Sequence, residues 1–283
     1  MRANRWHGYG QPAVLRSGDI GRRPTWQGDP VKEAPPGDDA SPDGRVVLIT
    51  GGSRGIGLAC AKWFLARGDR VAVTSRTGAV EDRLDAGTDR FMSLKCDVTE
   101  PEQVTAAFSA IEEAWGPVEV LVANAGITRD TLVLRMSEEA WSEVIDTNLT
   151  AVFRVAKRAL TKMIRLHRGR VIMISSAGAF IGSAGQANYA ASKAGLVGMA
   201  RSMAREVASR SITVNVVAPG LVETNMLAAL GEERMSEFLA QVPLGRVARA
   251  EEVAEAVGFL ASAGAGYVTG AVLPVDGGLA MGL

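Results

Sequence analysis

The stretch TGGSRGIG at residues 50–57 closes the apolar run VVLIT and opens a segment with helical spacing. Its glycines Gly51, Gly55 and Gly57 follow a G-x-x-x-G-x-G pattern. Glycine allows a tight turn and a close approach of the backbone to a pyrophosphate. The helix that follows would offer free N–H groups and the positive end of its dipole to those phosphates. A glycine-rich loop alone is weak evidence, but its place between a strand and a helix indicates a dinucleotide site.

The same alternation continues outward from this loop to the end of the chain. Short, mostly β-branched apolar runs alternate with longer segments of helical spacing, as expected for parallel strands buried on both faces and joined by helices. We therefore predict an α/β fold, a doubly wound (Rossmann) sheet of seven parallel strands with helices on both faces, in a single domain. The expected strands are 46–50, 71–75, 91–95, 120–124, 171–175, 213–217 and 272–275. The expected helices include 56–67, 101–115, 137–165, 188–208 and 250–262.

Residues 1–44 differ from the rest of the chain. They are rich in Gly, Pro, Arg and Asp and show neither helical nor strand periodicity. Such a segment buries too little apolar surface to offset its ordering entropy. We expect a disordered N-terminal extension, either a solvated tail or a binding peptide, followed by a reductase domain over 45–283.

Composition excludes several classes of protein. The 283 residues contain 31 Lys plus Arg and 31 Asp plus Glu, so there is no basic excess to suggest a nucleic-acid partner. The two cysteines, Cys60 and Cys96, have neither metal-ligand spacing nor the number for a disulfide framework. No apolar run reaches the length of a membrane span. We expect a cytoplasmic protein with no metal, no nucleic-acid partner and no membrane partner.

The end of the second expected strand indicates which dinucleotide is bound. An NAD site usually has an acidic residue there for the ribose 2′-hydroxyl, but this chain has Ser75 and Arg76. Together with Arg54 in the glycine loop, they suit the 2′-phosphate of NADPH, although Arg76 could simply cap a surface turn. Asp97, after the third strand, could bind the adenine amino group or cap the next helix.

Tyr189 and Lys193 form a Y-x-x-x-K pair that a helix would place on one face. A phenol with a pKa of about 10 is a better general acid when its pKa is lowered. One cation at about 4 Å and an effective dielectric near 20 supplies about 4 kcal/mol, enough for about three units. Ser176 closes the fifth strand at the sheet edge where ligands bind in such folds, and Asn124 and Asn148 could face the same cleft.

Taken in order, these motifs resemble those of the short-chain dehydrogenase/reductase family. The resemblance covers residues 45–283 and rests on TGGSRGIG, CDVT, ANAG, TNLT, Ser176, YAASK and VAPG. Within the family, RDTLVLRMSEEAWSEVIDTNLTAVFR and TGAVLPVDGG resemble the 3-oxoacyl-acyl-carrier-protein reductases, and GGLAMGL resembles an actinobacterial subgroup.

The resemblance implies NADPH-dependent reduction of 3-oxoacyl groups on acyl carrier protein in fatty acid biosynthesis, by a homotetramer. Tyr189 would donate the proton, Ser176 would bind the ketone oxygen, Lys193 would bind the nicotinamide ribose, and Asn148 would hold a water linked to Lys193. The implied cofactor-binding residues, which include Tyr189 and Lys193, are Gly51, Ser53, Arg54, Gly55, Ile56, Gly57, Arg76, Asp97, Val98, Asn124, Ala125, Gly126, Pro219, Gly220 and Val222.

Two other functions remain open at this point. The chain could reduce another ketone on the same fold, such as acetoacetyl-CoA, a sugar or a steroid, or it could be a catalytically silent nucleotide-binding protein. The presence of all four catalytic positions argues against the silent protein. Arg165, Arg168, Arg170 and Arg210 could receive an acidic carrier protein, or they could be solvated surface charges.

Overall fold

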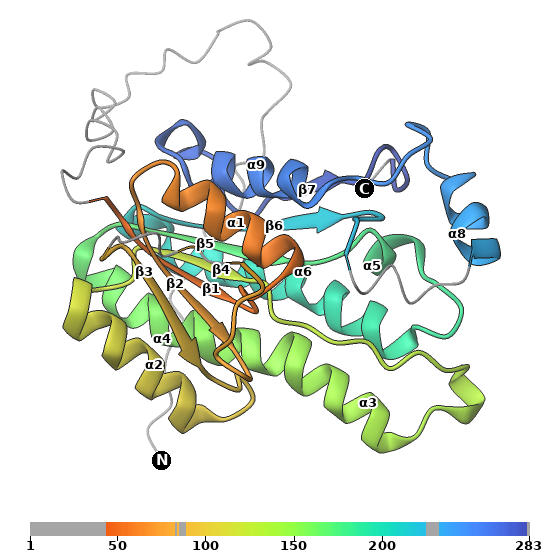
Figure 1. The fold of residues 1–283 in the computed structure, drawn as a ribbon, viewed down its shortest axis with the longest axis horizontal. Coiled ribbons are helices and arrows are strands. Elements are labelled where there is room, and N and C mark those ends of the chain that lie inside the picture. The colour runs from red at the N-terminus through yellow and green to blue at the C-terminus, as the bar shows by residue number, and fades with distance from the viewer. Residues whose placement is uncertain (1–43, 83, 85–88, 225–231, 282–283) are drawn as a thin grey trace, which may run out of the picture. The chain divides into compact units, whose positions relative to one another are not determined.

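The computed structural model describes residues 44–82, 84, 89–224 and 232–281. The predicted N-terminal extension therefore lies outside the described residues, apart from Gly44. Over the described part, seven parallel strands form one sheet in the order β3-β2-β1-β4-β5-β6-β7, which confirms the predicted doubly wound α/β fold (Figure 1). The strands are β1 (Val46–Thr50), β2 (Arg70–Ser75), β3 (Phe91–Lys95), β4 (Val120–Ala123), β5 (Gly169–Ile174), β6 (Ile212–Pro219) and β7 (Val272–Val275).

The helices connect these strands and cover both faces of the sheet. The α-helices are α1 (Gly55–Leu65), α2 (Pro101–Trp115), α3 (Glu138–Ile145), α4 (Ala151–Leu166), α5 (Gly178–Ile181), α6 (Ala187–Val207), α8 (Glu232–Leu239) and α9 (Ala250–Ala261). Short turns of other helical types are η1 (Val133–Arg135), η2 (Asp146–Thr150), η3 (Ala208–Arg210) and η4 (Ala263–Ala265). Among the described helices, none combines the length and apolar character that crossing a membrane requires.

Two hydrophobic cores lie on opposite faces of the sheet. One face packs against α2, α4 and α6, and the other packs against α1 and α9, which lie side by side in Figure 1. The α1–α9 contact depends on Gly258, because a Cβ there would lie 2.2 Å from the Trp63 ring. The central strands are buried along both faces, as their continuous apolar composition predicts.

The structure corrects the predicted helix over 137–165. That segment is divided into α3 and α4 by η2, a π-helical turn at Asp146–Thr150. Ser137 begins α3 as its N-cap, accepting a hydrogen bond from the Ala140 N–H at 3.2 Å. A single π-helical turn widens the backbone and commonly marks a functional position.

Candidate active site

The carboxyl ends of β1, β4, β5 and β6 bring the predicted site residues to one edge of the sheet. β1 pairs with β2 on one side and with β4 on the other, so the direction of strand order reverses between β1 and β4. Loops that leave neighbouring strands at such a switch point move apart and leave a crevice for a ligand. The glycine loop follows β1, and residues 124–126 follow β4 at this position.

Asn124 ties the glycine loop to β4. Its side chain donates hydrogen bonds to the backbone oxygens of Thr50 and Gly51, both at 3.0 Å. The Thr50 hydroxyl accepts bonds from the backbone N–H groups of Asn124 at 3.1 Å and Ala125 at 3.2 Å. The side-chain amide and the backbone N–H of Asn124 are therefore both occupied in shaping the loop.

Two glycines of the loop are needed for different reasons. Gly51 has a φ of +65°, a left-handed conformation that favours glycine. Gly57 is needed for space, because a Cβ there would lie 2.4 Å from the Gly51 oxygen and 2.7 Å from Asn124 Nδ2. Sequence reasoning missed Gly52, where a Cβ would lie 2.6 Å from the Val73 Cβ.

The N-terminus of α1 fits a phosphate group. Arg54 is the N-cap residue, yet no side chain caps the helix and its first turn carries no acidic residue. The first N–H groups of a helix have no intrahelical acceptor, and they carry the positive end of the helix dipole. Ser53, Arg54 and Ile56 thus border an end of α1 that suits a pyrophosphate.

The loops after β2 and β3 border the same edge. Arg76 is exposed, and it makes no hydrogen bond or ion pair with any residue the structure describes. The turn after β2 is closed instead by Ser75, whose hydroxyl accepts a bond from the Gly78 N–H at 3.0 Å. The alternative role of Arg76 as a turn cap therefore finds no support, and its guanidinium is available to a ligand.

Asp97 does not cap α2, whose N-cap residue is Glu100. One Asp97 oxygen accepts bonds from the Thr99 N–H at 3.0 Å and from the Thr99 hydroxyl at 2.7 Å. The hydrogen bonds from the Thr99 hydroxyl and then from the Thr99 N–H, with a smaller effect from the charge of Arg76, keep the pKa of Asp97 below its usual value, although burial acts in the opposite direction. The carboxylate is thus ionised, and Val98 beside it is buried.

Tyr189 and Lys193 lie one turn apart on α6, as their spacing predicts. The Lys193 ammonium is buried, donates a hydrogen bond to the Ile174 oxygen at 2.8 Å and lies 5.8 Å from the centre of the Tyr189 ring. The Tyr189 hydroxyl shares a hydrogen bond with Ser176, whose own hydroxyl also accepts the Gly178 N–H at 3.1 Å. Ser175 holds α6 to β5 by donating to the Lys193 backbone oxygen at 2.8 Å.

The pKa of Tyr189 departs from the sequence-based expectation. We expected Lys193 to lower it, but burial of the phenol raises the pKa of Tyr189 above 10.0, with a smaller upward contribution from Asp130. The hydrogen bond with Ser176 acts in the opposite direction. Lys193 is itself removed from water, which lowers its own pKa to about 8, because burial penalises the charged ammonium.

Asn148 enters the site from the π-helical turn. It is fully buried; its Oδ1 accepts the Ile127 N–H at 2.8 Å, and its Nδ2 donates to the Ile127 oxygen at 3.0 Å and to Ser192 Oγ at 3.1 Å. A Cβ on Gly126 would lie 3.2 Å from Asn148 Oδ1 and 3.3 Å from Lys193 Nζ. Asn148 Oδ1 and Lys193 Nζ thus both face the Cα of Gly126. Because Gly126 has no side chain, the space between these two atoms can take a small polar group that binds both.

The loop after β6 completes the edge. Pro219 ends β6, and Gly220 packs so closely on Asp276 that a Cβ would lie 2.8 Å from the Asp276 Cα. Val222 is buried and forms a parallel bridge with Ala248. The chain beyond Thr224 and before Glu232 lies outside the described residues.

Comparison with known proteins settles the family. The family profile described as "Enoyl-(Acyl carrier protein) reductase" matches residues 51–280. The chain belongs to the short-chain dehydrogenase/reductase family. The match spans most of the glycine loop, the Tyr–Lys pair and the last strand, and of the elements that form the site only β1 lies before it.

Several curated members of the short-chain dehydrogenase/reductase family are similar to this chain over most of its length. The 3-oxoacyl-acyl-carrier-protein reductase FabG of Vibrio cholerae is 49% identical over 241 residues, covering 84% of this chain and 98% of that protein. The protein of the same name from Escherichia coli is 48% identical over 243 residues, with the same coverage. The 3-oxoacyl-acyl-carrier-protein reductase MabA of Mycobacterium avium is 50% identical over 238 residues, covering 84% of this chain and 91% of that protein.

Sequence reasoning missed the residues that support the Tyr–Lys pair. Thr50, Ser175 and Ser192 hold the site by side-chain bonds to backbone groups. Thr50 and Ser192 stand inside the motifs TGGSRGIG and YAASK, which could have drawn attention to them, and Ser175 only precedes Ser176. Asn188, which is also fully buried, stands next to Tyr189, and this position was the only signal that could have drawn attention to it.

The arginines expected to receive a carrier protein lie at the amino ends of β5 and β6, at the opposite edge of the sheet from the site. Arg165 and Arg168 precede β5 and Arg210 precedes β6, but Arg170, expected just before the fifth strand, is the second residue of β5. Arg168 Nε lies 2.9 Å from Glu119 Oε2, and Arg170 donates to the backbone oxygens of Gly169 and Ser211. Arg210 contacts His167 Nε2 at 2.9 Å. Two of these arginines thus hold backbone and acidic groups within the fold, so carrier binding at this edge stays a prediction.

Proposed function

We propose that this protein is an NADPH-dependent 3-oxoacyl-acyl-carrier-protein reductase of fatty acid biosynthesis. The observation that carries the proposal is the placement of Ser176, Tyr189, Lys193 and Asn148 beside an uncapped glycine loop at one sheet edge. The relatives named FabG and MabA, at 48–50% identity, are reductases of this substrate class.

The chain's own residues can perform the proton half of the reduction. The bound cofactor supplies the hydride to the ketone carbon. Tyr189 transfers its hydroxyl proton to the ketone oxygen, so that the carbonyl becomes a hydroxyl and the phenol becomes a phenolate. Ser176 donates a hydrogen bond to the same oxygen and stabilises its developing negative charge. A protonated Lys193 favours the phenolate electrostatically and is positioned to bind a ribose hydroxyl.

Proton resupply follows from the open space at Gly126. Asn148 Oδ1 and Lys193 Nζ both face that space. Lys193 would give a proton toward the Tyr189 phenolate and regain one from solvent through a water in this space. Lys193 would also hold a ribose hydroxyl of the bound cofactor. Asn148 can keep this role while its amide holds Ile127 and Ser192, because a carbonyl oxygen has two lone pairs.

The preference for NADPH rests on Arg76 and Arg54. Neither side chain has a hydrogen-bond or ion-pair partner among the residues the structure describes, and both border the edge that suits the dinucleotide. The Arg76→Ala variant should bind NADPH about 1.5–3 kcal/mol more weakly, the usual contribution of a charged hydrogen bond. NADH binding to the same variant is the control and should be unchanged. Wild-type kcat/KM equal to or better with NADH would contradict the preference.

A direct test of the function uses oxidation of NADPH by the purified protein with two thioesters. An acetoacetyl thioester offers a ketone oxygen to Ser176 and Tyr189, whereas a 2-enoyl thioester of equal length offers a carbon–carbon double bond. We expect turnover with the first and little with the second, and faster turnover when the acyl group is on a carrier protein. Preference for the enoyl thioester, or no turnover with either, would overturn the proposal.

We further infer a homotetramer in the cytoplasm. On α4, Phe153 is 45% exposed and Ile164 is 37% exposed, so this helix presents apolar side chains that a partner helix would cover. On α6, Gly198 has open space around it, so a partner helix could approach closely. Strand β7 ends the sheet with an unpaired edge among the described strands.

A further inference from the structure

Tyr189 lies at the start of α6, where the backbone N–H groups need acceptors other than the backbone oxygens of the helix. It is the third residue of α6, and the first N–H groups of a helix have no intrahelical acceptor. The N-cap residue Gln186 provides no side-chain cap, because its amide instead donates to Asp130 Oδ2 at 2.8 Å. The orientation of the proton donor therefore depends on other groups.

Asn188 supplies that support from a fully buried position. Its Oδ1 accepts the Tyr189 N–H at 2.8 Å. Its Nδ2 donates to the Arg129 oxygen at 3.1 Å and to the Ala140 oxygen at 3.3 Å. One side chain thus joins the catalytic helix to the loop after β4 and to the first turn of α3.

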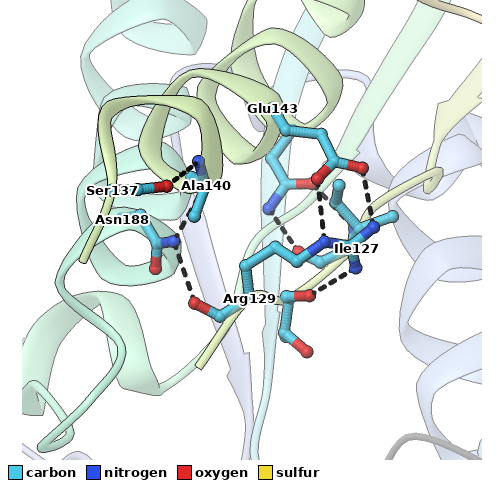
Figure 2. Close-up of polar contacts among 8 residues, drawn as sticks. Ile127, Arg129, Ser137, Ala140, Glu143 and Asn188 are labelled. Carbon is cyan, nitrogen blue, oxygen red and sulfur yellow. Dashed lines mark hydrogen bonds and ion pairs between the residues drawn. The ribbon is translucent and has the colours of Figure 1, made fainter. Parts of the chain in front are cut away.

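The two acceptors of Asn188 are themselves held in place. Figure 2 shows Ser137 bonded to the Ala140 N–H and the Arg129 guanidinium bonded to the Glu143 carboxylate. The Arg129–Glu143 pair is bidentate, with distances of 2.8 and 2.6 Å. The two carbonyl groups that Asn188 contacts are therefore fixed by other hydrogen bonds. Asn188 can for this reason hold the first turn of α6 in one position.

The other end of the Tyr189 residue is held in the same way. The Tyr189 backbone oxygen accepts a bond from Ser192 Oγ at 2.7 Å, and Ser192 is in turn bonded to Asn148. We propose that Asn188 is a positioning residue for the proton donor, the counterpart of Asn148 on the N–H side of Tyr189. This inference rests on the proposed function. It predicts that loss of Asn188 impairs proton transfer more than binding.

The test replaces Asn188 by Ala and by Asp, with Asn215 as the matched control. Asn215 is also fully buried, donates to the Val268 oxygen at 2.8 Å and accepts the Ala271 N–H at 3.1 Å, but it lies within β6. Asn188→Ala should lower kcat by about 30- to 100-fold, the usual cost of a misplacement near 1 Å, with KM and the NADPH Kd within about threefold. Asn215→Ala should change kcat by less than about threefold even if it lowers Tm equally.

The Asn188→Asp variant provides a readout that a purely structural role would not give. The carboxylate that it introduces lacks the donor that the Arg129 and Ala140 oxygens require, whereas the protonated carboxyl group restores one donor and one acceptor. Burial of this carboxyl group against two carbonyl oxygens raises its pKa, so kcat of Asn188→Asp relative to wild type should rise as pH falls from about 8 to 6. The neighbouring ionisable groups Arg129, Asp130, Glu139, Glu143, Tyr189 and Lys193 are common to both proteins, so the ratio cancels their titration.

The outcomes separate this inference from the proposed function. If wild type reduces no 3-oxoacyl thioester, the proposed function fails first. If wild type is active but Asn188→Ala loses no more kcat than Asn215→Ala, or loses kcat and NADPH affinity in parallel, Asn188 is merely structural. If Asn188→Ala does not fold, a flat kcat ratio for Asn188→Asp between pH 6 and 8 overturns the proposal by itself.

Discussion

At the scale of the residue, the proposed chemistry depends on the Tyr189 hydroxyl. The Tyr189→Phe variant removes only that oxygen, because the ring and the backbone bonds to Asn188 and Ser192 remain. We expect kcat to fall by at least about 10²–10⁴-fold, the usual contribution of a positioned general acid. Steady-state turnover and NADPH affinity should be measured together, and affinity should be nearly unchanged. Turnover above a few per cent of wild type would mean that another group donates the proton.

Lys193 opposes folding while it supports catalysis. Its folded-state pKa is about 8, against about 10.4 for an unfolded lysine. Between these values the unfolded state binds more protons, so the free energy of unfolding should rise as pH increases from about 8 to 10.4. Below pH 8 the full cost of burial is present, about 3 kcal/mol at 1.36 kcal/mol per pKa unit.

Lys193→Met tests this cost. At pH 7 the variant should be more stable than wild type by up to about 3 kcal/mol, and its stability should not rise between pH 8 and 10. Wild-type kcat should fall as pH passes about 8, because Lys193 loses the charge that favours the Tyr189 phenolate. Urea unfolding at several pH values measures the first effect, and a pH–rate profile measures the second. A Met variant less stable than wild type at pH 7 would contradict the argument.

At the scale of the element, the glycine loop is shaped by what packs behind it. Gly57→Ala would place a Cβ 2.4 Å from the Gly51 oxygen, so the loop or α1 must move. We expect NADPH affinity to fall at least tenfold, at about 1.4 kcal/mol per factor of ten, and stability to fall by about 1–3 kcal/mol.

The matched control for Gly57 is Gly264. A Cβ added at Gly264 would lie 3.4 Å from Ser262 Oγ, which is an ordinary contact. Gly264 belongs to the turn η4, far from the glycine loop in the sequence. Calorimetric titration with NADPH and thermal unfolding should show little change for Gly264→Ala. Equal affinity of the two variants for NADPH would show that the close packing of Gly57 is not what forms the cofactor site.

At the scale of the whole molecule, the proposed tetramer would use the exposed apolar face of α4. Phe153→Asp places a charge where a partner helix would bury it, which costs several kcal/mol if the charge stays unpaired. Light scattering should show a tetramer for wild type and a smaller species for the variant. Lys95→Glu, on β3 at the sheet edge opposite β7, is the control and should leave the mass unchanged. A wild-type monomer at micromolar concentration would end the proposal.

The sequence by itself determined the order of strands and helices and the residues that meet at the site. The apolar runs 46–50, 91–95 and 272–275 were predicted as strands with the bounds that the structure has. Of these, only β1 is buried on both faces, whereas β3 and β7 are the partly buried edge strands of the sheet. The glycine loop and the i, i+4 spacing of Tyr189 and Lys193 are local patterns, and local patterns survive into the fold because neighbouring residues impose them.

Only the tertiary structure decided which polar groups are satisfied and which are free. Three features depend on how the chain packs around them. They are the π-helical turn that positions Asn148, the hydrogen bond of Ser75 that closes the turn after β2, and the ion pair of Arg168 with Glu119. The direction of the Tyr189 pKa shift was also decided there, because desolvation depends on everything packed around the phenol and not on the lysine four residues away. For the same reason the sequence shows only that Asn188 precedes Tyr189, because its role exists only once the loop after β4, α3 and α6 meet.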